Sequence, residues 1–204
     1  MYKFQRRLAI RLISHTIFCN HESMKIIRML TVLLTLLVCL PNAKAQHLKV
    51  SDIPQLKVED FKAKAPKDNP YWAYTSYKIL YRLDSVIHIA HNKVKLKFIT
   101  KVDVLNDHNY FNLEKIPADR IASVLNHEQG HVLIGFIIAN KLEELLSAKV
   151  WSDNFREEVG KEYGKQLAKY AKLNERYDEA TKHGMDDVMQ SKWDKELQAL
   201  FGVN

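Results

Sequence analysis

The spacing of apolar residues changes its period near Pro117, and this change limits the chain to a fold that combines strands with helices. Before Pro117, residues 93–105 alternate between apolar and charged side chains, which is typical of a half-buried antiparallel strand. After Pro117, the apolar residues recur at helical spacing. Strands followed by helices predict an α+β domain, with an N-terminal antiparallel sheet packed on a C-terminal helical part.

The same patterns predict approximate bounds for each element. Three helices are expected, at 117 to about 149, 154 to about 176, and 185 to about 200. Strands are expected at 71–83 and 93–105, and 86–90 is a candidate third strand. Residues 46–70 are polar and contain three prolines, so we expect an entry segment there with at most one short edge strand.

The N-terminal part of the chain has the features of a leader. Basic residues follow Met24, an apolar run continues to Leu40, and Ala43 and Ala45 have the small-x-small spacing of a cleavage site. This order is typical of a secretory signal peptide, and residues 1–23 would then be an upstream extension.

Removal of residues 1–45 would leave a single domain over residues 46–204, exported to the periplasm or outside the cell. The apolar run of the leader is about a dozen residues long, which is too short to span a bilayer. We therefore expect no stable membrane span after removal. Lipid attachment at Cys39 is the less favoured alternative, because Val38 is bulky where such signals have a small residue.

The basic character of the full chain comes largely from this leader. Seven of the 31 basic residues but only one of the 24 acidic ones lie in residues 1–45, which leaves 24 basic and 23 acidic residues in the mature part. A net charge of +1 gives no support for nucleic-acid binding. Both cysteines, Cys19 and Cys39, also lie in the leader, so the mature part has no disulfide, thiolate metal ligand or cysteine nucleophile.

Residues 126–131 read Asn-His-Glu-Gln-Gly-His, and this HExxH pattern predicts a zinc site. His127 and His131 are four residues apart and lie on one face of a helix, where both can bind one zinc ion. Glu128 would act as general base towards a water that the metal activates. Apolar residues flank the motif, so this helix should be largely buried, where histidine and glutamate require partners. They are Ile121, Val124, Leu125, Val132, Leu133, Phe136, Ile137 and Ile138.

Two motifs of the chain resemble those of an uncharacterised bacterial family thought to consist of secreted zinc-dependent proteases. Leu125–His131 is similar to the HExxH helix of that family, and Tyr177-Asp178-x-x-Thr181-x-His183-Gly184 is similar to its second motif. The resemblance covers most of residues 58–197 and implies a hydrolase with a zincin-like core. Family members often carry acidic residues after the second histidine, whereas residues 132–136 here are Val-Leu-Ile-Gly-Phe.

A catalytic zinc site needs a third protein ligand, which must be His, Asp or Glu here because cysteine is absent. If the second long helix returns antiparallel to the first, the segment that follows it reaches the level of His131. His183 is the favoured third ligand, and the second family motif contributes to that preference. Glu175, Asp178 and Glu179 are the alternatives.

The sequence therefore predicts an exported zinc-dependent metallohydrolase, above all a peptidase that acts on peptides or proteins. Asp178 could also orient a ligand histidine, and Tyr177 could donate to a developing oxyanion. Two other functions remain open. The protein could be a catalytically silent zinc-binding or protein-interaction module of the cell envelope, or a helical partner-binding domain without a metal.

Overall fold

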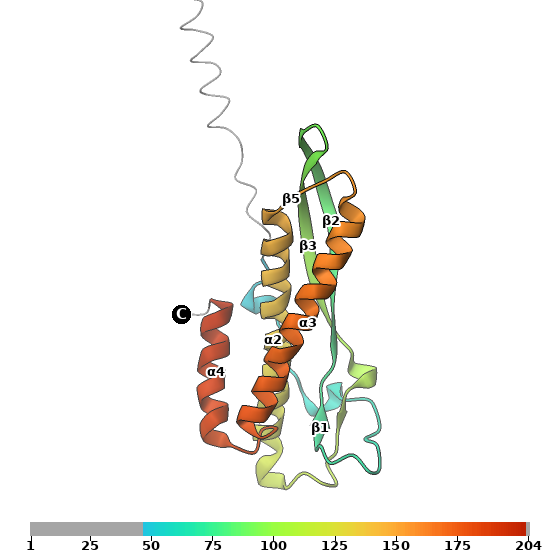
Figure 1. The fold of residues 1–204 in the computed structure, drawn as a ribbon. Coiled ribbons are helices and arrows are strands. Elements are labelled where there is room, and N and C mark those ends of the chain that lie inside the picture. The colour runs from blue at the N-terminus through green and yellow to red at the C-terminus, as the bar shows by residue number, and fades with distance from the viewer. Residues whose placement is uncertain (1–46, 203–204) are drawn as a thin grey trace, which may run out of the picture. The chain divides into compact units, whose positions relative to one another are not determined.

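The computed structural model describes residues 47–202, so the predicted leader lies outside the described residues. Residues 47–202 form one compact unit (Figure 1). Short strands and 3-10 turns come first, a long β-hairpin follows, and three helices complete the chain. The predicted α+β class, with an antiparallel sheet before a helical part, is confirmed.

Two small antiparallel sheets make up the β part. The larger contains β2 (Tyr77–Ala90), β3 (Lys93–Val104) and β5 (Val150–Trp151) in the order β2-β3-β5. In the smaller sheet, β1 (Ala73–Tyr74) pairs with β4 (Tyr110–Phe111). The alternation predicted for residues 93–105 is confirmed in β3, which buries its even-numbered residues from Val94 to Thr100.

The strands differ from the prediction in three places. The predicted strand at 71–83 is split, because Ser76 lies between β1 and β2 and donates its backbone N–H to the side chain of Asn109 (2.7 Å) rather than to a strand. The prediction of a separate strand at 86–90 is wrong, since β2 continues to Ala90 through two register shifts. Residues 47–70 contain no strand, only the 3-10 turns η1 (Val50–Asp52) and η2 (Val58–Asp60).

The helices are α2 (Ile121–Ala148), α3 (Phe155–Thr181) and α4 (Asp187–Phe201), and two further 3-10 turns, η3 (Asn106–His108) and η4 (Ala118–Arg120), precede α2. The bounds of α2 and α4 agree with the prediction within a few residues. The predicted end of α3 near Arg176 is wrong, because residues 177–183 contain no glycine or proline that would end the helix there. The helix continues until Lys182 adopts a left-handed conformation (φ 51°).

Helix α2 forms the centre of the domain, in contact with the β2–β3 hairpin, α3 and α4 (Figure 1). Its C-terminal half supplies Ile134, Ile137 and Leu142 to a core that includes Trp193 and Leu197 of α4. None of the helices in residues 47–202 is both long and apolar enough to cross a membrane. The burial of α2 places the HExxH residues inside the protein rather than on its surface.

Candidate metal centre

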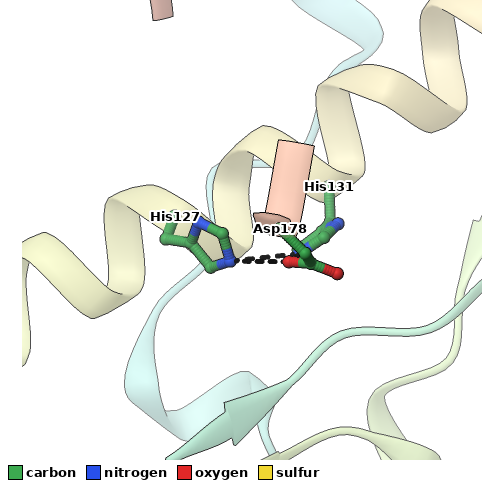
Figure 2. Close-up of side chains that lie close together, drawn as sticks. All are labelled: His127, His131 and Asp178. Carbon is green, nitrogen blue, oxygen red and sulfur yellow. Dashed lines mark hydrogen bonds and ion pairs between the residues drawn. The ribbon is translucent and has the colours of Figure 1, made fainter. Parts of the chain in front are cut away.

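His127 and His131 lie one turn apart on α2 and meet Asp178 of α3 (Figure 2). The Nε2 atoms of the two histidines are 3.3 Å apart. The Oδ1 atom of Asp178 lies 3.1 Å from the first Nε2 and 3.0 Å from the second. A tetrahedral zinc ion with bonds of about 2.0–2.1 Å separates its ligand atoms by about 3.3 Å, so this spacing fits one ion.

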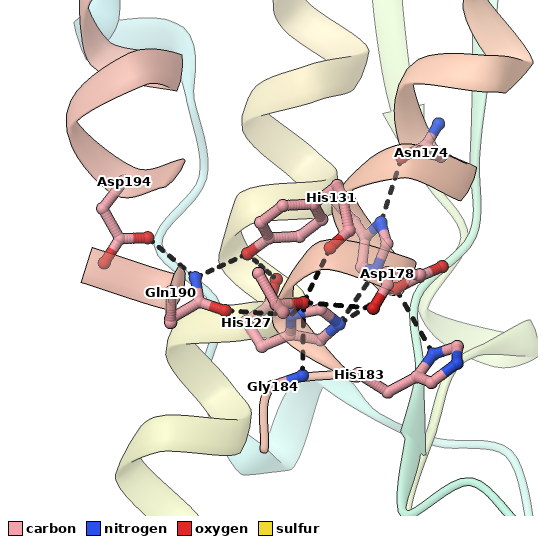
Figure 3. Close-up of polar contacts among 10 residues, drawn as sticks. His127, His131, Asn174, Asp178, His183, Gly184, Gln190 and Asp194 are labelled. Carbon is pink, nitrogen blue, oxygen red and sulfur yellow. Dashed lines mark hydrogen bonds and ion pairs between the residues drawn. The ribbon is translucent and has the colours of Figure 1, made fainter. Parts of the chain in front are cut away.

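The amide of Gln190 in α4 fixes the orientation of the His127 ring (Figure 3). Its nitrogen donates to Oδ1 of Asp194 (2.8 Å), and because a carboxylate only accepts hydrogen bonds, the amide oxygen must point the other way. That oxygen lies 3.1 Å from Nδ1 of His127. Nδ1 must therefore carry a hydrogen, and Nε2 is the ring nitrogen that faces Asp178.

His131 has an equivalent partner on α3. The side-chain oxygen of Asn174 lies 3.0 Å from Nδ1 of His131, and the side-chain nitrogen of Asn174 donates to the hydroxyl of Tyr77 (2.8 Å). Each histidine is thus oriented by an amide oxygen at Nδ1 and leaves Nε2 for the centre. Outer-shell hydrogen bonds of this kind hold metal-binding histidines in position.

The charges around the two Nε2 atoms favour a cation. Burial would lower the pKa of His131, but its hydrogen bond to Asp178 and the nearby Glu128 carboxylate raise the pKa overall. Burial would raise the pKa of Asp178, yet hydrogen bonds to His127 and His131 hold that pKa well below its usual range. A cation at this point, either a proton on His131 or a metal ion, would balance the Asp178 carboxylate.

Glu128 is 4% exposed and lines the same cavity as the two histidines. Its Oε2 atom has no hydrogen-bond partner within residues 47–202. A buried carboxylate oxygen without a partner is costly in a folded protein unless water, substrate or an ion satisfies it. Glu128 therefore has the position and the free acceptor that a general base requires.

Tyr177 is fully buried, and its ring stacks on that of His127 with a centroid distance of 4.7 Å. Its hydroxyl donates to the backbone oxygen of His127 (3.1 Å) and accepts from the amide of Gln190 (2.7 Å). Gly130 makes this approach possible, because a Cβ at that position would lie 2.1 Å from the hydroxyl oxygen. The geometry favours a positioning role for Tyr177 over the predicted oxyanion role.

His183 lies beside the centre but is not part of the three-residue group. Its Nδ1 atom is 3.5 Å from Oδ1 of Asp178, its side chain is 48% exposed, and its ring packs against Tyr71. The backbone from Lys182 to Gly184 is left-handed throughout, and a Cβ on Gly184 would lie 2.8 Å from the Cβ of His127. The turn thus holds His183 at the cavity, while Glu175 is exposed elsewhere on α3.

The structure brings together most of the predicted site residues, with Asp178 rather than His183 between the two histidines. The sequence reasoning missed Asn174, Gln190 and Asp194. A signal was available for one of them: Gln190 lies on the face of α4 that also buries Trp193 and Leu197, and a polar residue on such a face must find a partner.

Comparison with known proteins places the chain in a family. It belongs to the family described as "Bacterial protein of unknown function (DUF922)", whose model matches residues 49–184. The matched range contains both histidines, Glu128, Asp178 and His183. No curated protein and no solved structure matches the chain.

Proposed function

We propose that this member of an uncharacterised bacterial family is a zinc-dependent hydrolase, with a peptide bond as its target. The observation that carries the proposal is the convergence of three ligand atoms, His127 Nε2, His131 Nε2 and Asp178 Oδ1, beside the free carboxylate oxygen of Glu128. Two imidazoles and one carboxylate are a ligand set found in catalytic zinc sites.

Zinc in this centre would supply a Lewis acid for the substrate carbonyl and for the attacking water. Residues of the protein would carry out the proton transfers. Glu128 Oε2 takes a proton from the water as the water oxygen forms its bond to the carbonyl carbon. The same carboxyl group then gives the proton to the departing amine nitrogen when the C–N bond breaks. Gln190 and Asn174 keep both Nδ1 atoms occupied throughout, so the rings cannot rotate away.

The surroundings of the centre suit a polymer substrate. A cavity of about 730 Å³ contains His127, Glu128 and His131, together with residues from β1, β2 and α3. A volume of this size exceeds what a single water or small anion requires and is within the range of ligand-binding sites. We propose a peptide or protein substrate for this reason, and a periplasmic or extracellular location on the strength of the predicted leader.

Metal analysis combined with a peptide digest tests this function. We expect about one zinc per chain in protein purified without a histidine tag. The zinc-loaded protein should cleave bonds in a complex peptide mixture, lose this activity with a chelator, and regain it when zinc is restored. Zinc binding without any cleavage would favour a silent zinc-binding module, and protein that folds without affinity for zinc would refute the metal centre.

A further inference from the structure

The cavity at the metal centre has two chemically different ends. Its acidic and basic side chains lie at the end that holds the three ligand atoms, and they include Lys182 and His183 as well as Glu128. From His131 to Ile138 on α2 and from Asn174 back to Leu167 on α3, the cavity continues for two helical turns. At 1.5 Å per residue this corresponds to about 10 Å beyond the centre.

The far end of the cavity is lined by uncharged side chains. They come from β2, α2 and α3: Tyr77, Ile79, Ile138, Leu167, Tyr170 and Ala171. Ile79 and Ile138 are buried in the main hydrophobic core, so the floor of this end is apolar. The hydroxyl of Tyr77 already accepts a hydrogen bond from Asn174, so the wall nearest the centre is fixed in place.

Tyr77 also separates this end from the backbone of α2. A Cβ at Gly135 would lie 2.9 Å from the Tyr77 ring, so the glycine allows the ring to approach the helix closely. Because Asn174 binds both Tyr77 and His131, the same side chain forms the border of the apolar end and orients a metal ligand. A group in the apolar end would therefore be held at a constant distance from the reacting atoms.

We propose that this apolar end is a subsite for a large uncharged side chain, such as phenylalanine, tyrosine or leucine, next to the bond that is cleaved. The inference rests on the proposed hydrolase function and names its substrate class. A phenyl or isobutyl group in an apolar pocket is favoured over glycine by about 10- to 100-fold. A charged side chain such as glutamate is disfavoured, because it would lose its hydration without gaining a partner.

Two alanines on α3 provide a matched pair of variants. Both residues are exposed on the same helix, but Ala171 lines the apolar end of the cavity and Ala168 lies outside the cavity. The substitution Ala171→Trp should fill the subsite, and Ala168→Trp adds the same side chain to the surface. The zinc-loaded wild-type protein and both variants are compared on peptides that differ only in carrying Phe, Leu, Gly or Glu beside the cleaved bond.

We expect wild type and Ala168→Trp to cleave the Phe and Leu peptides about 10- to 100-fold more efficiently, in kcat/KM, than the Gly and Glu peptides. Ala171→Trp should lose this preference and cleave the Phe and Leu peptides no more efficiently than the Gly peptide. Cleavage without a preference for Phe or Leu, or the same behaviour in both tryptophan variants, would overturn the subsite and leave the hydrolase function intact.

A binding measurement keeps the two proposals separate. N-acetyl-phenylalanine amide and N-acetyl-glycine amide are titrated into the zinc-loaded protein by NMR. If no peptide is cleaved, the hydrolase function fails, but tighter binding of the phenylalanine amide that Ala171→Trp abolishes would still support the subsite. Equal binding of the two amides would overturn it.

Discussion

Helix α2 carries two buried glutamates with different surroundings. Glu143 is fully buried, and its Oε2 atom accepts hydrogen bonds from the backbone nitrogen (2.9 Å) and the hydroxyl (3.0 Å) of Thr100 in β3. Glu128 is almost as buried, but it lines a cavity and lies near two histidines. Each has one oxygen without a partner among residues 47–202. Burial alone therefore does not mark a carboxylate as a candidate general base, whereas access to a cavity and to possible ligand atoms does.

The largest effect is expected when the two glutamates receive the same substitution. Glu128→Gln removes the base while keeping its size, so hydrolysis should fall by about 10²- to 10⁴-fold with zinc retained. Glu143→Gln keeps an acceptor for Thr100 and lies away from the cavity, so its activity should stay near wild type. Peptide cleavage and zinc content should be measured for both variants. A similar loss of activity in both would contradict the different roles of the two glutamates.

The second prediction concerns the third ligand. Asp178→Ala should weaken zinc binding by more than about 100-fold, the upper end of the effect seen for outer-shell partners. His183→Ala should weaken it less, because His183 lies outside the three-residue group. Competition with a chromophoric chelator gives both affinities. If His183→Ala loses zinc while Asp178→Ala retains it, the assignment from the sequence is correct and Asp178 is an outer-shell residue.

The third prediction tests the amide that orients His127. Gln190→Ala should weaken zinc binding by about 10- to 100-fold, because Nδ1 of His127 loses its acceptor. Gln198→Ala is the matched control on the same helix, where the side chain is exposed. Zinc affinities and unfolding midpoints of both variants should be compared. Equal zinc affinities in both variants would show that the ring does not depend on Gln190.

A stability measurement at Gly130 shows how closely the site is packed. Gly130→Ala forces the Tyr177 ring to move, and overpacking of this kind costs about 1–3 kcal/mol of unfolding free energy. At Gly164 on α3 an added Cβ meets nothing within 4 Å. Gly164→Ala should therefore stabilise the protein by about 0.5–1 kcal/mol. Denaturant unfolding of both variants gives the two values, and a Gly130→Ala variant as stable as wild type would mean that Tyr177 is free to shift.

The smallest effect is a pH dependence of the metal-free protein. The pKa of His131 is raised by folding, so its ion pair with Asp178 stabilises the fold below about pH 6.5 and is lost as the pH rises through the folded pKa. Stability should therefore decline on the alkaline side, and His131→Asn should lack this decline. Thermal unfolding across pH 6–9, with a chelator present and the ionic strength held constant, measures this decline in stability. A pH profile that His131→Asn leaves unchanged would contradict the ion pair.

Much of this arrangement could be predicted because it follows from local spacing. The spacing of four residues from His127 to His131 places both on one helix face, and the alternation in β3 determines which side of the strand is buried. The amide partners could not be predicted in this way. Asn174 and Gln190 are 43 and 63 residues from the histidines that they contact, and no spacing rule connects an amide with a distant imidazole.

The end of α3 was predicted incorrectly for a related reason. Tyr177 and Asp178 are predicted from the sequence to lie in a separate segment, although residues 177–181 contain no glycine or proline and continue the helix. Once the helix is extended, Asp178 lies one turn after Asn174 and faces the same side. This single change in the bounds of α3 moves Asp178 from an alternative to the position between the two histidines.

Because Asn174 and Asp178 lie on one continuous helix, the site tolerates no insertion or deletion between them. One residue inserted between them would turn everything that follows by about 100° and move it by about 1.5 Å along the axis, so Asp178 would leave the histidines while Asn174 stayed. The turn at His91 and Asn92 is exposed and joins two strands far from the site. Insertions should be harmless in that turn and should abolish zinc binding within α3, so the spacing of these two residues is as much a requirement of the site as their identity.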